Sequence, residues 1–127
     1  MIKKYKGLEY IVFMEHFNHC GYVKLPENHP YQKFVGKKKK AFGQTLYIGY
    51  DLMDIFCHGG LTFTRKITKQ NQNNFPQGFS LGSWIGWDYG HYGDYMSIFP
   101  QFKGKIWNEK EITKECKNVI KQLLLKK

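Results

Sequence analysis

A chain of 127 residues has the length of one domain, and its 20 lysines and arginines outnumber its 10 acidic residues, which gives a formal net charge of +10. No apolar run approaches the ~18 residues of a membrane-spanning helix, and the apolar stretch near the start is too short and too acidic for a signal peptide. We therefore expect a single domain over residues 1–127, located in the cytoplasm and without membrane contact. The 3 cysteines lack Cys-x-x-Cys spacing, which favours reduced thiols over a disulfide framework or a zinc ribbon.

The positive charge comes almost entirely from lysine, because Arg65 is the only arginine. Lysine supplies diffuse, strongly hydrated charge, whereas arginine supplies most of the bidentate contacts that read bases, so this balance favours long-range attraction to phosphate-rich partners. Lysine enrichment also accompanies an AT-rich genome and solvated surfaces, which is the alternative explanation. The distribution is uneven: between Gln70 and Phe102 there is no lysine or arginine, and only Asp88 and Asp94 are charged.

The first part of the chain predicts short strands joined by loops. Residues 8–15 are rich in β-branched and aromatic side chains and predict a largely buried strand. Residues 17–21 predict a turn, and residues 22–25 a short extended segment that ends before Pro26. The lysine run at 37–40 predicts an exposed loop or the tip of a hairpin.

The middle of the chain predicts further strands. Residues 46–50 and 61–67 predict two of them, the second with the alternation of a half-exposed antiparallel strand, and residues 51–55 between them predict one helical turn. Residues 70–78 predict a polar loop, and residues 79–87 a strand. Two glycines in this strand suggest bulges, or the close approach of another backbone or a ligand: Gly82 and Gly86.

The end of the chain predicts an amphipathic helix. Asn108 is a suitable N-cap, and Glu111 stands at the third helical position, as in a capping box. The apolar residues recur at spacings of three and four: Ile112, Cys116, Val119, Ile120 and Leu123. Cys116 is therefore expected in the core and not as a nucleophile. Together the elements predict an α+β fold, an antiparallel β-sheet with one long C-terminal amphipathic helix packed on one face.

Residue types that carry chemistry gather in two stretches of the chain. Asp88, His91 and Asp94 are spaced by three among glycines that favour a loop, and His58 with the pair Gly59 and Gly60 could converge on them from the mouth of a strand. Histidine and aspartate can hold a divalent metal or act as base and orienter in general base catalysis. Since no recognised metal spacing is present, and both residue types are common in turns, we assign no metal and no cofactor.

Aromatic side chains in the same region suggest stacking on bases or rings, with His58, Arg65 and Lys66 meeting phosphate. A core of tryptophan and tyrosine is the alternative for at least some of them. Because neighbouring strand residues face opposite sides, we expect Trp84 on one face of the sheet and Trp87, across the irregularity at Gly86, on the other.

Several motifs in a fixed order resemble one family. Residues 21–30 read GYVKLPENHP, residues 58–63 read HGGLTF, and residues 84–94 contain WIGWD followed by His91 and a Gly-Asp pair. In this order, and with the C-terminal helix, they resemble a widespread family of small proteins encoded by bacteriophages and prophages. The resemblance covers residues 21–123 and singles out five polar residues: His29, His58, Asp88, His91 and Asp94. Tyr89 and Tyr92 stand where the family has small residues beside the histidine, which argues against a narrow pocket.

The resemblance implies a phage protein that acts in the host bacterium, and three hypotheses follow. The first is an anti-defence binding protein that contacts a host defence protein or ribonucleoprotein, in the manner of an anti-CRISPR inhibitor of an RNA-guided effector, or that sequesters a nucleotide-like anionic ligand. The second is a small metal-dependent hydrolase that acts on a nucleotide or phosphoester, and the third is an accessory structural protein. Each hypothesis is compatible with a homo-oligomer. The candidate ligand-binding residues are His29, His58, Gly59, Gly60, Thr62, Arg65, Trp87, Asp88, His91 and Asp94.

Overall fold

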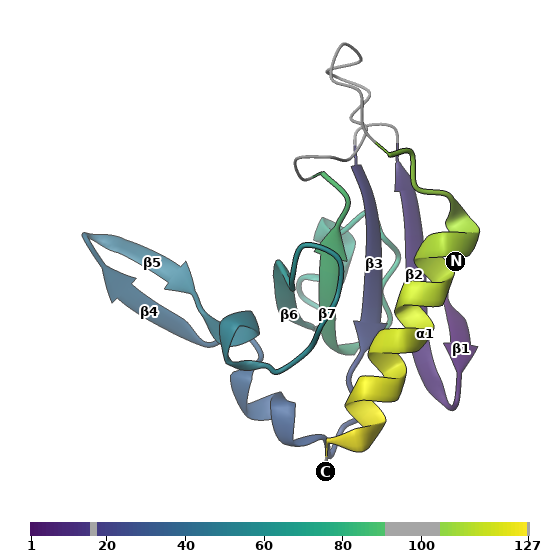
Figure 1. Cartoon of the computed structure of the whole chain (residues 1–127). Helices are drawn as coiled ribbons and strands as arrows, with labels where there is room; N and C mark the ends of the chain where they lie inside the picture. Colours follow the sequence, from purple (N-terminus) through teal and green to yellow (C-terminus); the bar gives the residue numbers. More distant parts are fainter. Residues whose placement is uncertain (16–17, 91–104, 127) are drawn as a thin grey trace.

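The computed structural model describes residues 1–15, 18–90 and 105–126 (Figure 1). Its main sheet is antiparallel, has 5 strands and follows the order β1-β2-β3-β7-β6. The strand bounds are β1 Lys3–Tyr5, β2 Leu8–Glu15, β3 Asn18–Lys24, β6 Phe63–Ile67 and β7 Gly82–Asp88. The helix α1, Glu109–Leu125, packs on one face of this sheet against β2 and β3. The predicted α+β fold is thereby confirmed.

A hairpin stands apart from this sheet. Its strands β4, Lys38–Ala41, and β5, Gln44–Tyr47, pair only with each other among the described strands, and the hairpin extends away from the main sheet (Figure 1). Short 3-10 helices flank it: η1, Pro30–Phe34, and η2, Gly49–Leu52. A third, η3, Gln72–Asn74, lies in the connection between β6 and β7.

The alternation of side chains divides the core into two layers. The layer under α1 contains Tyr10, Val23, Ile85 and Trp87, together with the whole predicted helix stripe: Ile112, Cys116, Val119, Ile120 and Leu123. The layer on the other face contains Ile11, Tyr22 and Trp84, and the β6–β7 connection covers it with Phe75 and Phe79. Trp84 and Trp87 therefore lie on opposite faces, as predicted.

Two sequence predictions hold closely. The strand over residues 8–15 is β2, and the capping box is present, with Asn108 Oδ1 accepting from Glu111 N at 2.8 Å and Glu111 Oε1 accepting from Asn108 N at 3.3 Å. Lys105 also binds the Glu111 carboxylate, with Nζ 2.7 Å from Oε2, and this contact lowers the pKa of Glu111. These were the stretches with the strongest local patterns.

Other boundaries differ from the prediction. The turn over residues 17–21 is wrong because β3 begins at Asn18, where pairing with β2 on one side and later with β7 on the other outweighs the local preference of Gly21. The strand predicted over residues 46–50 is shifted, since β5 covers Gln44–Tyr47 and η2 begins at Gly49. The strand predicted over residues 61–67 begins two positions later, at Phe63.

Gly86 shows why glycine stands in the middle of β7. The register of β7 with β3 and β6 runs through this position without a bulge, and a Cβ there would collide with the ring of Tyr22. The close approach expected at Gly86 is therefore made by a side chain of the neighbouring strand.

We predict that Asn108→Ala lowers the free energy of unfolding by about 1 kcal/mol, because it removes the N-cap of α1. Thermal or urea unfolding followed by circular dichroism measures the change. Asn118→Ala is the matched control, because Asn118 lies exposed in the middle of the same helix, where alanine is the better helix former. Equal destabilisation by both substitutions would contradict the capping role.

Candidate functional site

His58 and Asp88, which the sequence singled out together, lie on opposite faces of the sheet. Asp88 pairs with Cys20, which belongs to the layer away from α1. Tyr89, the next residue, is buried in the layer under α1, and the ring of His58 stacks on it at a centroid distance of 4.6 Å. The convergence of His58 on Asp88 is therefore not observed. His91 and Asp94 lie outside the described residues.

His58 lies in an aromatic niche beside α1. Its ring centroid is 4.8 Å from that of Trp107, and its backbone N–H donates to Glu115 Oε1 at 2.9 Å. Gly59 and Gly60 adopt φ of +68° and +80°, so together they form the tight turn that holds the His58 ring on Tyr89. A cavity of about 420 Å³ adjoins this niche.

The thiol of Cys57 lines the same cavity. Burial raises the pKa of Cys57 to about 12, and the Glu115 carboxylate contributes to the rise. Because the thiolate is the nucleophilic form, this environment suppresses reactivity at neutral pH. Burial likewise raises the pKa of Cys116 to about 12, in agreement with its predicted place in the core.

His29 connects two helix ends inside the fold. Its Nδ1 accepts from Tyr31 N at 3.0 Å, which makes it the N-cap of η1, and Nε2 consequently donates to Leu123 O at 2.8 Å near the end of α1. The side chain is buried. Both ring nitrogens therefore serve the fold.

Asp88 and Thr62 join the end of β7 to the start of β6. Asp88 Oδ2 accepts from Thr62 Oγ1 at 3.1 Å, and Oδ1 accepts from Gly90 N at 3.1 Å. Trp87 is buried beneath α1, where Nε1 donates to the Tyr89 hydroxyl at 3.0 Å. These predicted site residues thus have contacts that hold the strand ends together.

Arg65 occupies a different setting, at the base of the hairpin. Its Cζ lies 3.8 Å from the centroid of the Tyr47 ring, and Nη1 donates to Thr64 O at 2.8 Å. Lys38 Nζ lies 5.2 Å from the centroid of the same ring. A cavity of about 400 Å³ opens here, lined by Arg65, Tyr47 and Thr62 among others. Arg65 and Thr62 are among the predicted site residues, whereas Tyr47 and Lys38 are not, because the pairing of the hairpin strands that places them here has no local signal in the sequence.

The hairpin itself carries four consecutive lysines, Lys37–Lys40, and residues 37–48 contain no acidic side chain. Lys38 and Lys40 alternate with Lys39 along β4, and within the described residues none of the four forms an ion pair. The turn at the tip holds Phe42, whose side chain is fully exposed. The lysine run was predicted as an exposed loop or the tip of a hairpin. It does belong to a hairpin, but Lys38, Lys39 and Lys40 lie on strand β4 and not in the turn.

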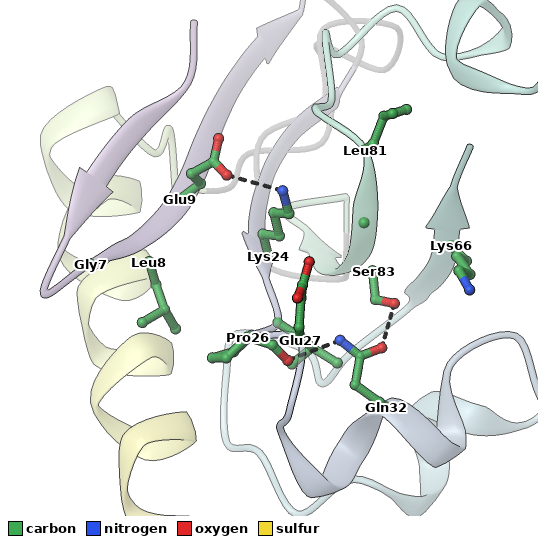
Figure 2. Close-up of a pocket in the computed structure, with 12 residues that line it drawn as sticks. Gly7, Leu8, Glu9, Lys24, Pro26, Glu27, Gln32, Lys66, Leu81 and Ser83 are labelled. Carbon is green, nitrogen blue, oxygen red and sulfur yellow. Dashed lines mark hydrogen bonds and ion pairs between the residues drawn. The ribbon is translucent and has the colours of Figure 1, made fainter. Parts of the chain in front are cut away.

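A further cavity of about 480 Å³ contains one ion pair, and the charged residues Glu27 and Lys66 also line it (Figure 2). In it Lys24 Nζ lies 3.2 Å from Glu9 Oε2 and donates to Ser80 Oγ at 3.1 Å. Gln32 and Ser83 are also bonded to each other, at 2.6 Å. Because the four polar side chains in these two pairs bind one another, they offer less to a charged ligand than the Arg65 guanidinium does.

The described residues contain no group of three or more His, Cys, Asp or Glu side chains placed to hold a metal ion. Nor does any helix in the described ranges have the length and apolarity to cross a membrane.

The chain matches no protein-family model, and no match to it was found among curated proteins or solved structures.

We predict that iodoacetamide at pH 8 modifies Cys57 far more slowly in the folded chain than in denaturant, because only about one thiol in 10⁴ is ionised when the pKa is near 12. Mass spectrometry of peptides after timed quenching measures both rates. Equal rates in the two states would show that the thiol is accessible and ionised in the fold.

We also predict that His29→Ala lowers the free energy of unfolding by about 1–3 kcal/mol, because two buried backbone groups lose their partner. His19→Ala is the control, since the half-buried His19 makes no side-chain hydrogen bond in the described part of the chain. Urea unfolding measures the free energy of unfolding of both variants. A smaller loss of this free energy in His29→Ala than in His19→Ala would contradict the structural role of His29.

Proposed function

We propose that this protein is a binding protein that contacts a single-stranded nucleic acid segment through the β4–β5 hairpin. In the phage setting that the resemblance implies, this segment would be the exposed nucleic acid of a host ribonucleoprotein, and the protein would act as an anti-defence inhibitor. The single observation that carries the proposal is a projecting strand pair (Figure 1) whose three lysines, Lys38, Lys39 and Lys40, form no ion pair within the described residues, and whose tip holds a fully exposed phenylalanine.

The lysines supply the electrostatic part of such binding. A row of lysines attracts phosphates at long range and reads no base sequence, so it suits a partner whose sequence varies. A two-stranded ribbon is also slender, and it is marginally stable without neighbours. Contact with a polyanion would relieve the mutual repulsion of Lys38, Lys39 and Lys40, which are consecutive residues of one short strand.

Phe42 supports the stacking part. Phe42 and Gly43 form the two-residue turn, both with positive φ, at +53° and +72°. Turns of this kind favour Asn-Gly, and a left-handed phenylalanine costs about 1–2 kcal/mol. The exposed ring contributes no packing to the fold in return. An aromatic platform for a nucleic acid base explains a residue that the hairpin alone does not need.

No observation favours the metal-dependent hydrolase in the same way. Of its four proposed residues, His58 and Asp88 lie on opposite faces of the sheet, and the other two lie outside the described residues. We therefore propose the binding function alone.

We predict that Lys39→Ala combined with Lys40→Ala weakens binding of a labelled ~12-nucleotide single strand about tenfold and lowers the slope of log affinity against log salt by about 1.4. Fluorescence anisotropy between about 50 and about 200 mM salt measures both quantities. The matched control is Lys114→Ala with Lys121→Ala, which removes the same charge from exposed positions on α1. An equal loss in the control would reduce the effect to net charge and refute the hairpin interface.

Phe42→Asn separates binding from folding. We expect a higher melting temperature, because asparagine suits the left-handed turn, together with about tenfold weaker binding, because the stacking platform is lost. Differential scanning fluorimetry and the same anisotropy assay give the two readouts. Unchanged affinity for a variant that is more stable would show that the Phe42 ring does not contact the strand.

A further inference from the structure

The cavity at the base of the hairpin has the features of a preformed anion site. It lies between β5 with η2 on one side and the start of β6 on the other, and its volume is about 400 Å³. Arg65, the only arginine of the chain, is held there by the Tyr47 ring and by the carbonyl of Thr64. We propose that this cavity binds the phosphate end of a nucleotide, with the Arg65 guanidinium as its main contact.

The guanidinium is positioned before any ligand arrives. Three contacts restrict its rotation. Arg65 Cζ lies 3.8 Å from the centroid of the Tyr47 ring and 5.9 Å from that of the Phe63 ring, and Nη1 donates a hydrogen bond to Thr64 O. No carboxylate lies within ion-pair distance of it in the described parts of the chain. Since one N–H is used internally, the planar fork keeps donors for a phosphate, which it binds in bidentate fashion.

A second cation lies close by. Lys38 Nζ is 5.2 Å from the Tyr47 centroid, so a second positive side chain contacts the ring on which Arg65 stacks, although Lys38 does not itself line the cavity. The positive charge of Lys38 would add a longer-range attraction for a phosphate held by Arg65. This pairing favours a phosphomonoester, with its larger charge, over a carboxylate.

The rest of the lining suits a nucleoside more than a bare ion. Leu46, Ile48 and Tyr50 supply an apolar wall, and the volume exceeds what inorganic phosphate needs. Among the described residues that line the cavity, Asp51 is the one with a carboxylate. A carboxylate accepts hydrogen bonds from ribose hydroxyls and repels phosphate, so it orients a nucleotide with the phosphate toward Arg65 and the ribose toward Asp51.

The Arg65 contact does not depend on Lys39 and Lys40, the two lysines substituted in the test of the proposed function, because neither lines the cavity. The nucleotide could be free, or it could be the 5′-phosphorylated end of a strand that the hairpin holds. Both sources present the same phosphomonoester to Arg65.

Isothermal titration calorimetry with AMP, adenosine and inorganic phosphate tests the site. We expect AMP to bind at least about tenfold more tightly than either fragment, and Arg65→Lys, which keeps the charge but loses the fork and the stacking, to remove most of that preference. Lys114→Ala with Lys121→Ala is the control and should bind AMP like the unaltered chain. Asp51→Asn should reduce the difference in affinity between AMP and its 2′,3′-dideoxy analogue, because the substitution removes the carboxylate that accepts from the ribose hydroxyls.

Nuclear magnetic resonance of the unaltered chain makes the test independent of variant folding. Amide shifts on adding AMP should concentrate at residues 45–51 and 62–65. Shifts located elsewhere, or equal binding of AMP and adenosine, would overturn the proposal.

Oligonucleotides with a 5′-phosphate or a 5′-hydroxyl then distinguish the two sources. Tighter binding of the phosphorylated strand, lost in Arg65→Lys, assigns the site to a strand end. If AMP binds but the two oligonucleotides bind with equal affinity, the cavity is assigned to a free nucleotide. Lys39→Ala with Lys40→Ala should leave AMP binding intact, so failure of the hairpin interface and failure of this site are separable.

Discussion

The fold depends on a reciprocal packing of aromatic rings on glycines across the β3–β7 pair. Gly21 faces Trp87 in the register, and Gly86 faces Tyr22. A Cβ at Gly21 would come within 2.5 Å of the Trp87 ring, and one at Gly86 would strike the Tyr22 ring. Each strand thus gives up a side chain to admit the large ring of the other, once on each face of the sheet. The centre of the sheet tolerates little change on either side.

This arrangement sets both core layers and, through them, the place of the polar residues. Trp87 anchors the layer under α1 and hydrogen-bonds to Tyr89, whereas Tyr22 packs edge-on against Phe63 and Phe79 in the other layer. Because β7 alternates through this centre, Asp88 must fall on the face opposite Tyr89 and its partner His58. Residues that look like one cluster in the sequence are divided by the sheet itself.

The sequence predicted elements whose signals are local. The capping box and the apolar stripe of α1 are written within one helix, and the opposite faces of Trp84 and Trp87 follow from strand alternation. The start of β3 depends on pairing with two other strands, and a pattern that covers one strand cannot reveal it. The Arg65–Tyr47 contact joins residues 18 positions apart, from two sheets, so neither strand pattern contained it. The signal in the sequence for a basic site was the uneven distribution of charge, because lysine and arginine lie outside residues 70–102.

The junction between the hairpin and the body makes the two proposed sites parts of one surface. Lys37 N donates to Phe34 O and Ile48 N to Lys37 O, so η1 and the strand ends are tied together. A Cβ at Gly49 would collide with the carbonyl oxygen of Phe34, which leaves glycine as the residue that allows this contact. The same junction places Tyr47 at the end of β5, where Arg65 reaches it from β6. A ribbon that is marginal in isolation is thereby oriented at its base by backbone contacts, while its tip stays exposed. The stiff end is where a small anionic group can be bound with defined geometry, and the exposed end is where a longer polyanion can be contacted without sequence preference.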